Sequence, residues 1–178
     1  MTIRSQILET LGNASFQSLF LSEDSPRWVD QPGTKESLTS IALSSEVASK
    51  IRVLAHELSL EAGGQPDASL AEKYCKTLPE TFPHNAWGMP GHYAERLGKT
   101  LVGFGRPALP CLIELLGDRR PLGYFGSEEP TLSERMQYRV CDLAAYFASL
   151  IAGLPYRDDP DTKARDDYIR QLMLELQE

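Results

Sequence analysis

The sequence predicts an all-α protein, and three observations carry this prediction. Apolar residues recur at helical spacing, capping patterns precede several of these stretches, and glycine or proline follows them. No segment rich in Val, Ile and Thr shows the alternation typical of a half-buried strand. The buried face is clearest in residues 45–62, where the apolar positions are Val47, Ile51, Leu54, Ala55 and Leu58.

The first half of the chain is predicted as short helices separated by loops. Residues 3–21 favour one or two short helices, and the proline- and glycine-containing residues 22–35 favour a loop. Residues 38–43 are compatible with a short helix or an extended piece. After the helix at 45–62, a capping box at Ser69–Glu72 predicts a helix that continues to about Leu78.

Two long loops flank a predicted helical hairpin in the second half. Residues 79–91 contain three prolines and two glycines, which exclude a regular helix or a central strand. Helices are expected at 92–104 and 107–116, as antiparallel neighbours across a short break that includes Gly105. Gly103 and Gly105 are expected to let these helices turn and pack closely. The second loop spans residues 117–130.

The C-terminal part is predicted as two further helices. Thr131–Glu134 resembles a capping box that leads into a helix with its core at 138–152. Asp159 and Pro160 are expected to start the last helix, at about 160–177. Its outer face is predicted to carry i, i+4 ion pairs: Asp161–Arg165, Lys163–Asp167 and Asp166–Arg170.

Two segments resemble HEAT-like α-solenoid repeats. Residues 105–118, GRPALPCLIELLGD, are similar to the second helix of such a repeat and the turn after it. Residues 138–146, YRVCDLAAY, are similar to the first helix of the next repeat. The resemblance covers the stretch from about 92 to 178 and implies helical hairpins packed as a short HEAT-like solenoid or a compact bundle. It also implies binding of other macromolecules along a helical surface, and it transfers no catalytic residues.

Length and composition suggest a single domain. At 178 residues, 42% apolar and 24% charged, the chain matches an ordinary soluble globular protein. We expect one helical domain over 1–178, with a better-defined helical core at 35–178 and an N-terminal helix plus loop at 1–34. Neither a secretory signal nor a membrane-spanning run is apparent. The odd, widely spaced cysteines, Cys75, Cys111 and Cys141, favour a cytoplasmic location.

Net charge limits the classes of partner. A net charge of −7 argues against nucleic-acid and anionic membrane partners, which require clustered Lys and Arg. A protein partner remains, although moderate acidity also serves solubility.

Candidate reactive groups are few. Glu80 and His84 could form a carboxylate–imidazole pair for general base chemistry, but no nucleophile or oxyanion motif accompanies them. A metal site from Cys75, His84 and His92 matches no tight zinc spacing. We therefore expect no catalytic, cofactor-binding or metal-binding residue.

The two long loops carry the candidate protein-binding residues. Arginines and aromatic residues are typical interface anchors, and long loops are often functional. The alternative is that Arg119 or Arg120 pairs with a nearby carboxylate, at Asp118, Glu128 or Glu129, and that the aromatic residues hold the loop in place. The candidates are His84, Trp87, Arg119, Arg120, Tyr124 and Phe125.

The sequence therefore favours a non-enzymatic scaffold or adaptor domain that binds another protein. One alternative is an acidic inhibitor of the immunity type, which neutralises a basic enzyme or toxin. The other is a small enzyme that uses Glu80 and His84.

Overall fold

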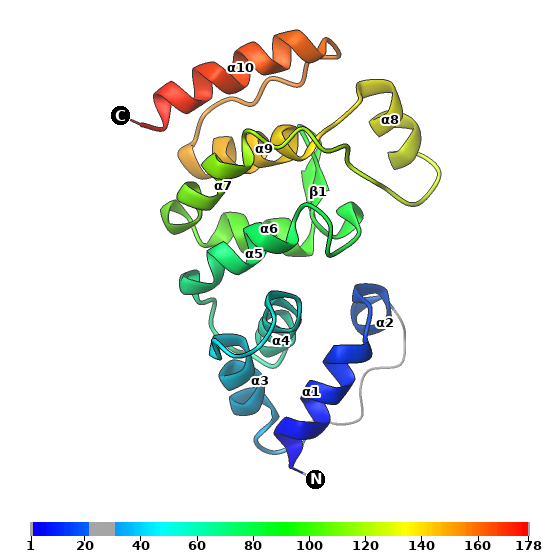
Figure 1. Cartoon of the computed structure of the whole chain (residues 1–178), viewed down its shortest axis with the longest axis vertical. Coiled ribbons are helices and arrows are strands. Elements are labelled where there is room, and N and C mark those ends of the chain that lie inside the picture. Colours follow the sequence, from blue (N-terminus) through cyan, green and yellow to red (C-terminus); the bar gives the residue numbers. More distant parts are fainter. Residues whose placement is uncertain (1, 22–30, 178) are drawn as a thin grey trace. The chain divides into compact units, whose positions relative to one another are not determined.

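The structure is a computed structural model that describes residues 2–21 and 31–177. It contains two compact units, Met1–Thr77 and Leu78–Glu178, each with its own buried apolar residues. Helices dominate both units (Figure 1), which confirms the all-α prediction. The single-domain organisation stays a prediction. Most of the loop expected at 22–35 falls on residues 22–30, outside the described residues.

In the first unit, α3 packs against α4, α1 packs against both, and α5 packs against α4. The ambiguous residues 38–43 belong to a helix because Leu38 and Ile41 are both fully buried on one face. The elements of this unit are α1 (Ile3–Asn13), α2 (Phe16–Phe20), α3 (Thr34–Leu43), α4 (Ser49–Glu61), the 3-10 turn η1 (Ala68–Leu70) and α5 (Ala71–Thr77).

The start of α5 differs from the predicted capping box at Ser69–Glu72. The cap is Asp67, whose carboxylate accepts a hydrogen bond from the Ser69 backbone N–H at 2.9 Å. Ser69 itself lies inside η1, and α5 begins two residues later. The prediction was wrong because the aspartate two positions earlier caps the turn.

A buried hydrogen-bond chain links α4 to α5. The Tyr74 hydroxyl donates to Glu57 Oε1 at 2.7 Å and lies 2.7 Å from His56 Nδ1. The Asp67 backbone N–H donates to His56 Nε2 at 3.3 Å. The Tyr74 hydroxyl already donates to Glu57, so it accepts from the Nδ1–H of His56. The Nε2 atom of His56 accepts from the Asp67 N–H. This arrangement holds His56 as the neutral Nδ1–H tautomer.

The buried His56 in this hydrogen-bond chain predicts that the first unit loses stability in acid. Burial is the main cause that lowers the pKa of His56 from 6.5 to about 4, against a smaller opposing effect of Asp67. The unfolded chain therefore binds a proton as the pH falls through about 6.5, whereas the folded chain does not until about pH 4. Stability is fully present above the unfolded pKa and falls below it, by about 3 kcal/mol near pH 4.

The measurement is urea unfolding of the wild type and His56→Gln at several pH values between 7 and 4. We expect the variant to be less stable at pH 7, because it loses the hydrogen bonds of the ring. The difference in free energy of unfolding between the two proteins should narrow as the pH falls. A gap that stays constant with pH would contradict the assignment.

In the second unit, α9 is the central helix. All residues from Val140 to Ser149 are buried, and α6, α7 and α10 pack around this helix (Figure 1). The elements are the 3-10 turn η2 (His84–Ala86), strands β1 (Gly88–Met89) and β2 (Tyr93–Ala94), α6 (Arg96–Gly103), the 3-10 turn η3 (Arg106–Ala108), α7 (Leu109–Leu115), α8 (Glu129–Met136), α9 (Val140–Ala152) and α10 (Thr162–Glu175).

The helix expected from residue 92 begins later, at Arg96. Met89 pairs with Tyr93 and Gly88 with Ala94 in a small antiparallel hairpin, so residues 93–94 are extended. Glu95 then caps α6 through its side chain. Residues 79–91 contain no α-helix, in line with their prolines and glycines.

The region expected to lead from Thr131 into one long helix instead forms two. The first, α8, already begins at Glu129 and ends at Met136, because Gln137 adopts a left-handed conformation with φ 52° and ψ 47°. A new capping box then starts α9, in which the Arg139 backbone N–H donates to the Asp142 carboxylate at 2.9 Å. The last helix also starts late, with Asp161 rather than Asp159 as its cap.

Candidate functional site

Within the second unit, the loops at 79–91 and 117–130 lie against each other through side-chain to backbone hydrogen bonds. The Gly123 N–H donates to His84 Nδ1 at 2.8 Å. Asn85 makes two bonds to the Phe125 backbone, accepting from N–H at 2.7 Å and donating to the carbonyl at 2.9 Å. The Tyr124 hydroxyl donates to the Gly88 carbonyl at 2.8 Å. A loop without regular secondary structure is thereby fixed in place.

His84 serves as part of this support. Its Nδ1 accepts from a backbone N–H, so the neutral ring carries its hydrogen on Nε2. Burial is the largest cause that lowers the pKa of His84 below its usual value. Glu80, the proposed catalytic partner, is exposed and forms an ion pair with Arg120. Both groups of the enzyme alternative thus have structural partners.

The three aromatic candidates have different exposures. Trp87 is fully buried, and Tyr124 is buried with its hydroxyl engaged by Gly88. Phe125 is 63% exposed although its backbone is bonded to Asn85. Of these three side chains, Phe125 is the one available to a partner, while the other two hold the loop and the core.

The two arginine candidates are engaged in ion pairs. Arg119 Nη1 lies 2.8 Å from Asp166 Oδ1 and also donates to Cys141 Sγ at 3.0 Å. Arg120 binds Asp118 through Nε at 3.0 Å, and its hydrogen bonds to Asp118 are the main cause that lowers the pKa of that carboxyl. The alternative that Asp118 pairs with an arginine is confirmed.

Glu128 and Glu129, the other two carboxylates of this alternative, are not the partners of Arg119 and Arg120. Neither carboxylate pairs with an arginine among the described residues. Arg119 pairs with Asp166, and Arg120 pairs with Asp118 and Glu80. The arginines are therefore charge-compensated.

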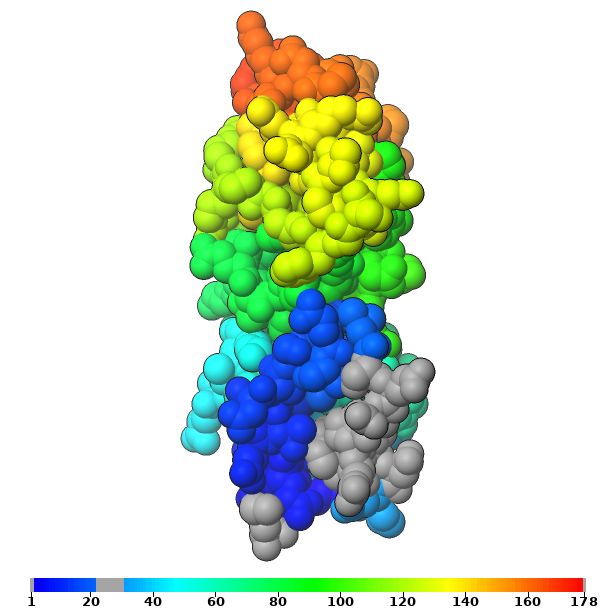
Figure 2. Space-filling view, turned by 90° about the vertical axis from the view of Figure 1, so that its right-hand side faces the viewer, coloured from blue at the N-terminus to red at the C-terminus, as the bar shows by residue number. Residues whose placement is uncertain are grey.

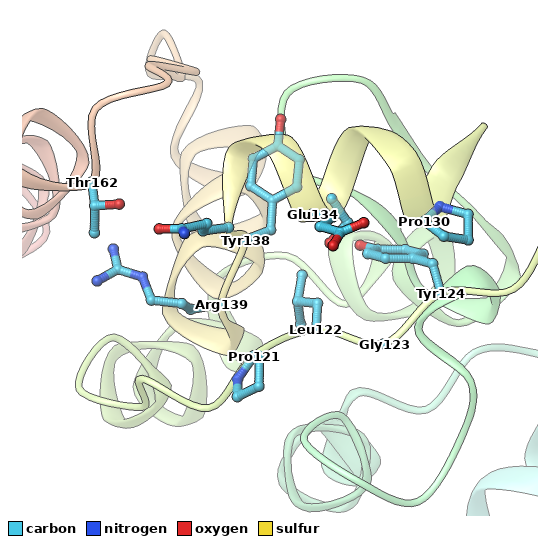
Figure 3. Close-up of a pocket in the computed structure, with 11 residues that line it drawn as sticks. Pro121, Leu122, Gly123, Tyr124, Pro130, Glu134, Tyr138, Arg139 and Thr162 are labelled. Atoms are coloured by element: carbon cyan, nitrogen blue, oxygen red, sulfur yellow. The ribbon is translucent and has the colours of Figure 1, made fainter. Parts of the chain in front are cut away.

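A groove of about 640 Å³ lies between the 117–130 loop and the α8–α9 junction. Figure 3 shows Tyr124, Pro130 and Glu134 at one end, Arg139 and Thr162 at the other, and Leu122 and Tyr138 between them. The segment around α8 forms much of the surface of this unit in the view of Figure 2. The lining residues are Pro121, Leu122, Gly123, Tyr124, Pro130, Ser133, Glu134, Gln137, Tyr138, Arg139 and Thr162.

The two tyrosines present their rings to the groove and use their hydroxyls elsewhere. The Tyr138 hydroxyl donates to the Asp158 carboxylate at 2.7 and 2.8 Å, and the Tyr124 hydroxyl donates to the Gly88 carbonyl. Burial raises the pKa of both phenols far above 10. With Leu122, these rings give the groove a mainly apolar floor.

The charged lining residues differ in their partners. Arg139 Nη2 lies 3.0 Å from Asp142 and 2.8 Å from Asp166, so its charge is balanced. Glu134 is exposed and has no ion pair or hydrogen bond to any described residue. The Arg139–Asp142 pair lies within the capping box that starts α9.

Sequence reasoning identified Tyr124 but not the rest of the groove. Leu122, Glu134 and Tyr138 had no local signal, because the groove forms only when residues 120–122 pair with 138–140. The pairing consists of Leu122 N–H to the Tyr138 carbonyl and Val140 N–H to the Arg120 carbonyl, both at 2.9 Å.

Across residues 2–21 and 31–177, no group of three His, Cys, Asp or Glu side chains is arranged to hold a metal ion. None of the helices in that part of the chain has the length and apolarity to span a membrane. Comparisons with family models, curated proteins and solved structures find no match.

Proposed function

We propose that this chain is a helical protein-interaction domain and that its binding surface consists of Phe125 together with the adjacent groove. The observation that supports this most is the fixed presentation of Phe125. Asn85 holds the Phe125 backbone at both its N–H and its carbonyl, while the ring is 63% exposed. An ordered aromatic side chain loses little conformational entropy on binding and is a typical interface anchor.

The test compares two equally exposed apolar residues of the second unit, Phe125 at 63% and Leu174 at 64%. Tagged full-length wild type, Phe125→Ser and Leu174→Ser are used to capture a stoichiometric protein partner from the native cell. We expect Phe125→Ser to weaken the captured complex about tenfold or more, since truncating an interface anchor costs about 2 kcal/mol. Equal binding by both variants, or no stoichiometric protein partner, would contradict the proposal.

A second candidate is an acidic inhibitor that binds a basic enzyme. The net charge of −7 and the unpaired Glu134 beside the groove favour it. Such a partner would lose activity on binding, and the association rate would fall steeply with salt. Both candidates are consistent with the HEAT-like resemblance of residues 92–178, which stays a prediction.

A further inference from the structure

We propose that the groove binds an extended peptide segment of the partner, with an apolar side chain on the floor and a Lys or Arg paired with Glu134. This inference rests on the proposed function and adds the chemistry of its partner.

The floor favours an apolar side chain. Leu122 and the rings of Tyr124 and Tyr138 line it, and both hydroxyls already donate to Gly88 and Asp158. A polar side chain placed there would lose water without gaining these hydroxyls as hydrogen-bond donors. An aliphatic or proline side chain loses nothing by the same transfer.

The charged residues of the groove favour a cationic side chain of the partner. Glu134 and Arg139 are the charged side chains that line the groove. Arg139 is compensated by Asp142 and Asp166, whereas Glu134 has no partner among the described residues. An incoming Lys or Arg would therefore gain one carboxylate, while an incoming carboxylate would find its cationic partner already occupied.

The side chain of Gln137 offers a hydrogen-bonding group to the main chain of an extended segment. Gln137 is the non-glycine residue with positive φ in the described part of the chain, and it lines the groove with an exposed side-chain amide. The left-handed conformation costs about 1 kcal/mol in a residue other than glycine or asparagine. The Gln137 amide can donate to and accept from the backbone of a peptide laid along the groove. We assign it that role.

The experiment begins with a phage-displayed library of short random peptides selected on the full chain. Enriched peptides are expected to combine an apolar residue with a nearby Lys or Arg. A labelled enriched peptide is then titrated by fluorescence anisotropy. Glu134→Gln is expected to weaken binding about tenfold, the size of a lost charge-assisted contact. Glu134→Lys should abolish binding and should regain it with a peptide whose basic residue is replaced by Glu.

Glu114→Lys is the matched control, because Glu114 is also exposed in the second unit, has no partner among the described residues and does not line the groove. Gln137→Gly tests the amide. It should weaken the peptide complex severalfold while the melting temperature rises, since glycine relieves the left-handed conformation. A merely structural glutamine would show the rise in melting temperature alone.

The outcomes separate this inference from the proposed function. Enrichment of acidic peptides, no enrichment, or binding that is indifferent to Glu134→Lys overturns the peptide inference, while loss of partner capture by Phe125→Ser still supports the interaction surface. Indifference of partner capture to Phe125→Ser overturns the proposed function, and with it the inference built on it.

Discussion

Arg165→Met is expected to lower the free energy of unfolding of the second unit by about 2–4 kcal/mol, because two carbonyls lose a donor and Asp142 keeps only Arg139 as its cationic partner. The Arg165 side chain is 1% exposed, and its Nε lies 3.2 Å from Asp142 Oδ1, a carboxylate with no solvent exposure. Its guanidinium also donates to the Met136 carbonyl at 2.8 Å and to the Asp159 carbonyl. Removing Arg165 leaves buried acceptors without their donor.

The measurement is urea unfolding followed by circular dichroism, with Arg135→Met as the matched control. Arg135 is exposed on α8 and has no partner among the described residues, so its loss should change stability by less than about 0.5 kcal/mol. The double variant Arg165→Met with Asp142→Leu should lose less than the sum of the single changes, because the Arg165–Asp142 contact that each single change removes is counted only once. A loss within about 1 kcal/mol for Arg165→Met would contradict the assigned role.

The Arg165–Asp142 pair shows why the sequence-based prediction for Arg165 was wrong. The i, i+4 spacing predicted a surface pair between Asp161 and Arg165, but Arg165 is buried and pairs with Asp142 instead. Position 165 lies four and seven residues before the buried Ile169 and Leu172, so it belongs to the inner face of α10. The spacing of the apolar residues predicts this inner face of α10. Arg165 was not assigned to it because a charged residue is usually placed on the surface.

Helices were predictable for a local reason. Apolar periodicity acts over one or two turns, so the buried faces of α4, α7 and α9 follow directly from neighbouring residues. The break at Gln137 was not predictable in the same way, because glutamine favours a helix and its left-handed conformation has no local signal. Tertiary context decides such a position.

The candidate site depends even more on contacts between distant residues. The bonds from His84 and Asn85 to residues 123 and 125 join positions 39 and 40 residues apart, so neither loop shows its geometry alone. Aromatic composition identified both loops but could not tell which rings support them. Trp87 is buried and Phe125 is exposed, although both come from proline- and glycine-rich loops of similar composition.

Gly98→Ala is the second change with a large expected effect, because α6 passes close to the backbone before β1. A Cβ at residue 98 would lie 2.1 Å from the Trp87 carbonyl oxygen and 2.7 Å from Phe147 Cζ. The oxygen belongs to the backbone and the ring belongs to the buried α9, so neither can move without shifting the core. We expect a loss of about 3 kcal/mol, at the upper end for overpacking.

Gly103→Ala is the control on the same helix, since a Cβ there meets nothing within 4 Å and φ is not positive. It should leave stability unchanged or raise it by up to about 1 kcal/mol, as alanine favours helix over glycine. The close helix packing expected at Gly103 is not present, and the tight contact of α6 lies at Gly98, against Trp87 and Phe147. Equal unfolding midpoints for the two variants would contradict this assignment, because the contact with the Trp87 carbonyl is what separates them.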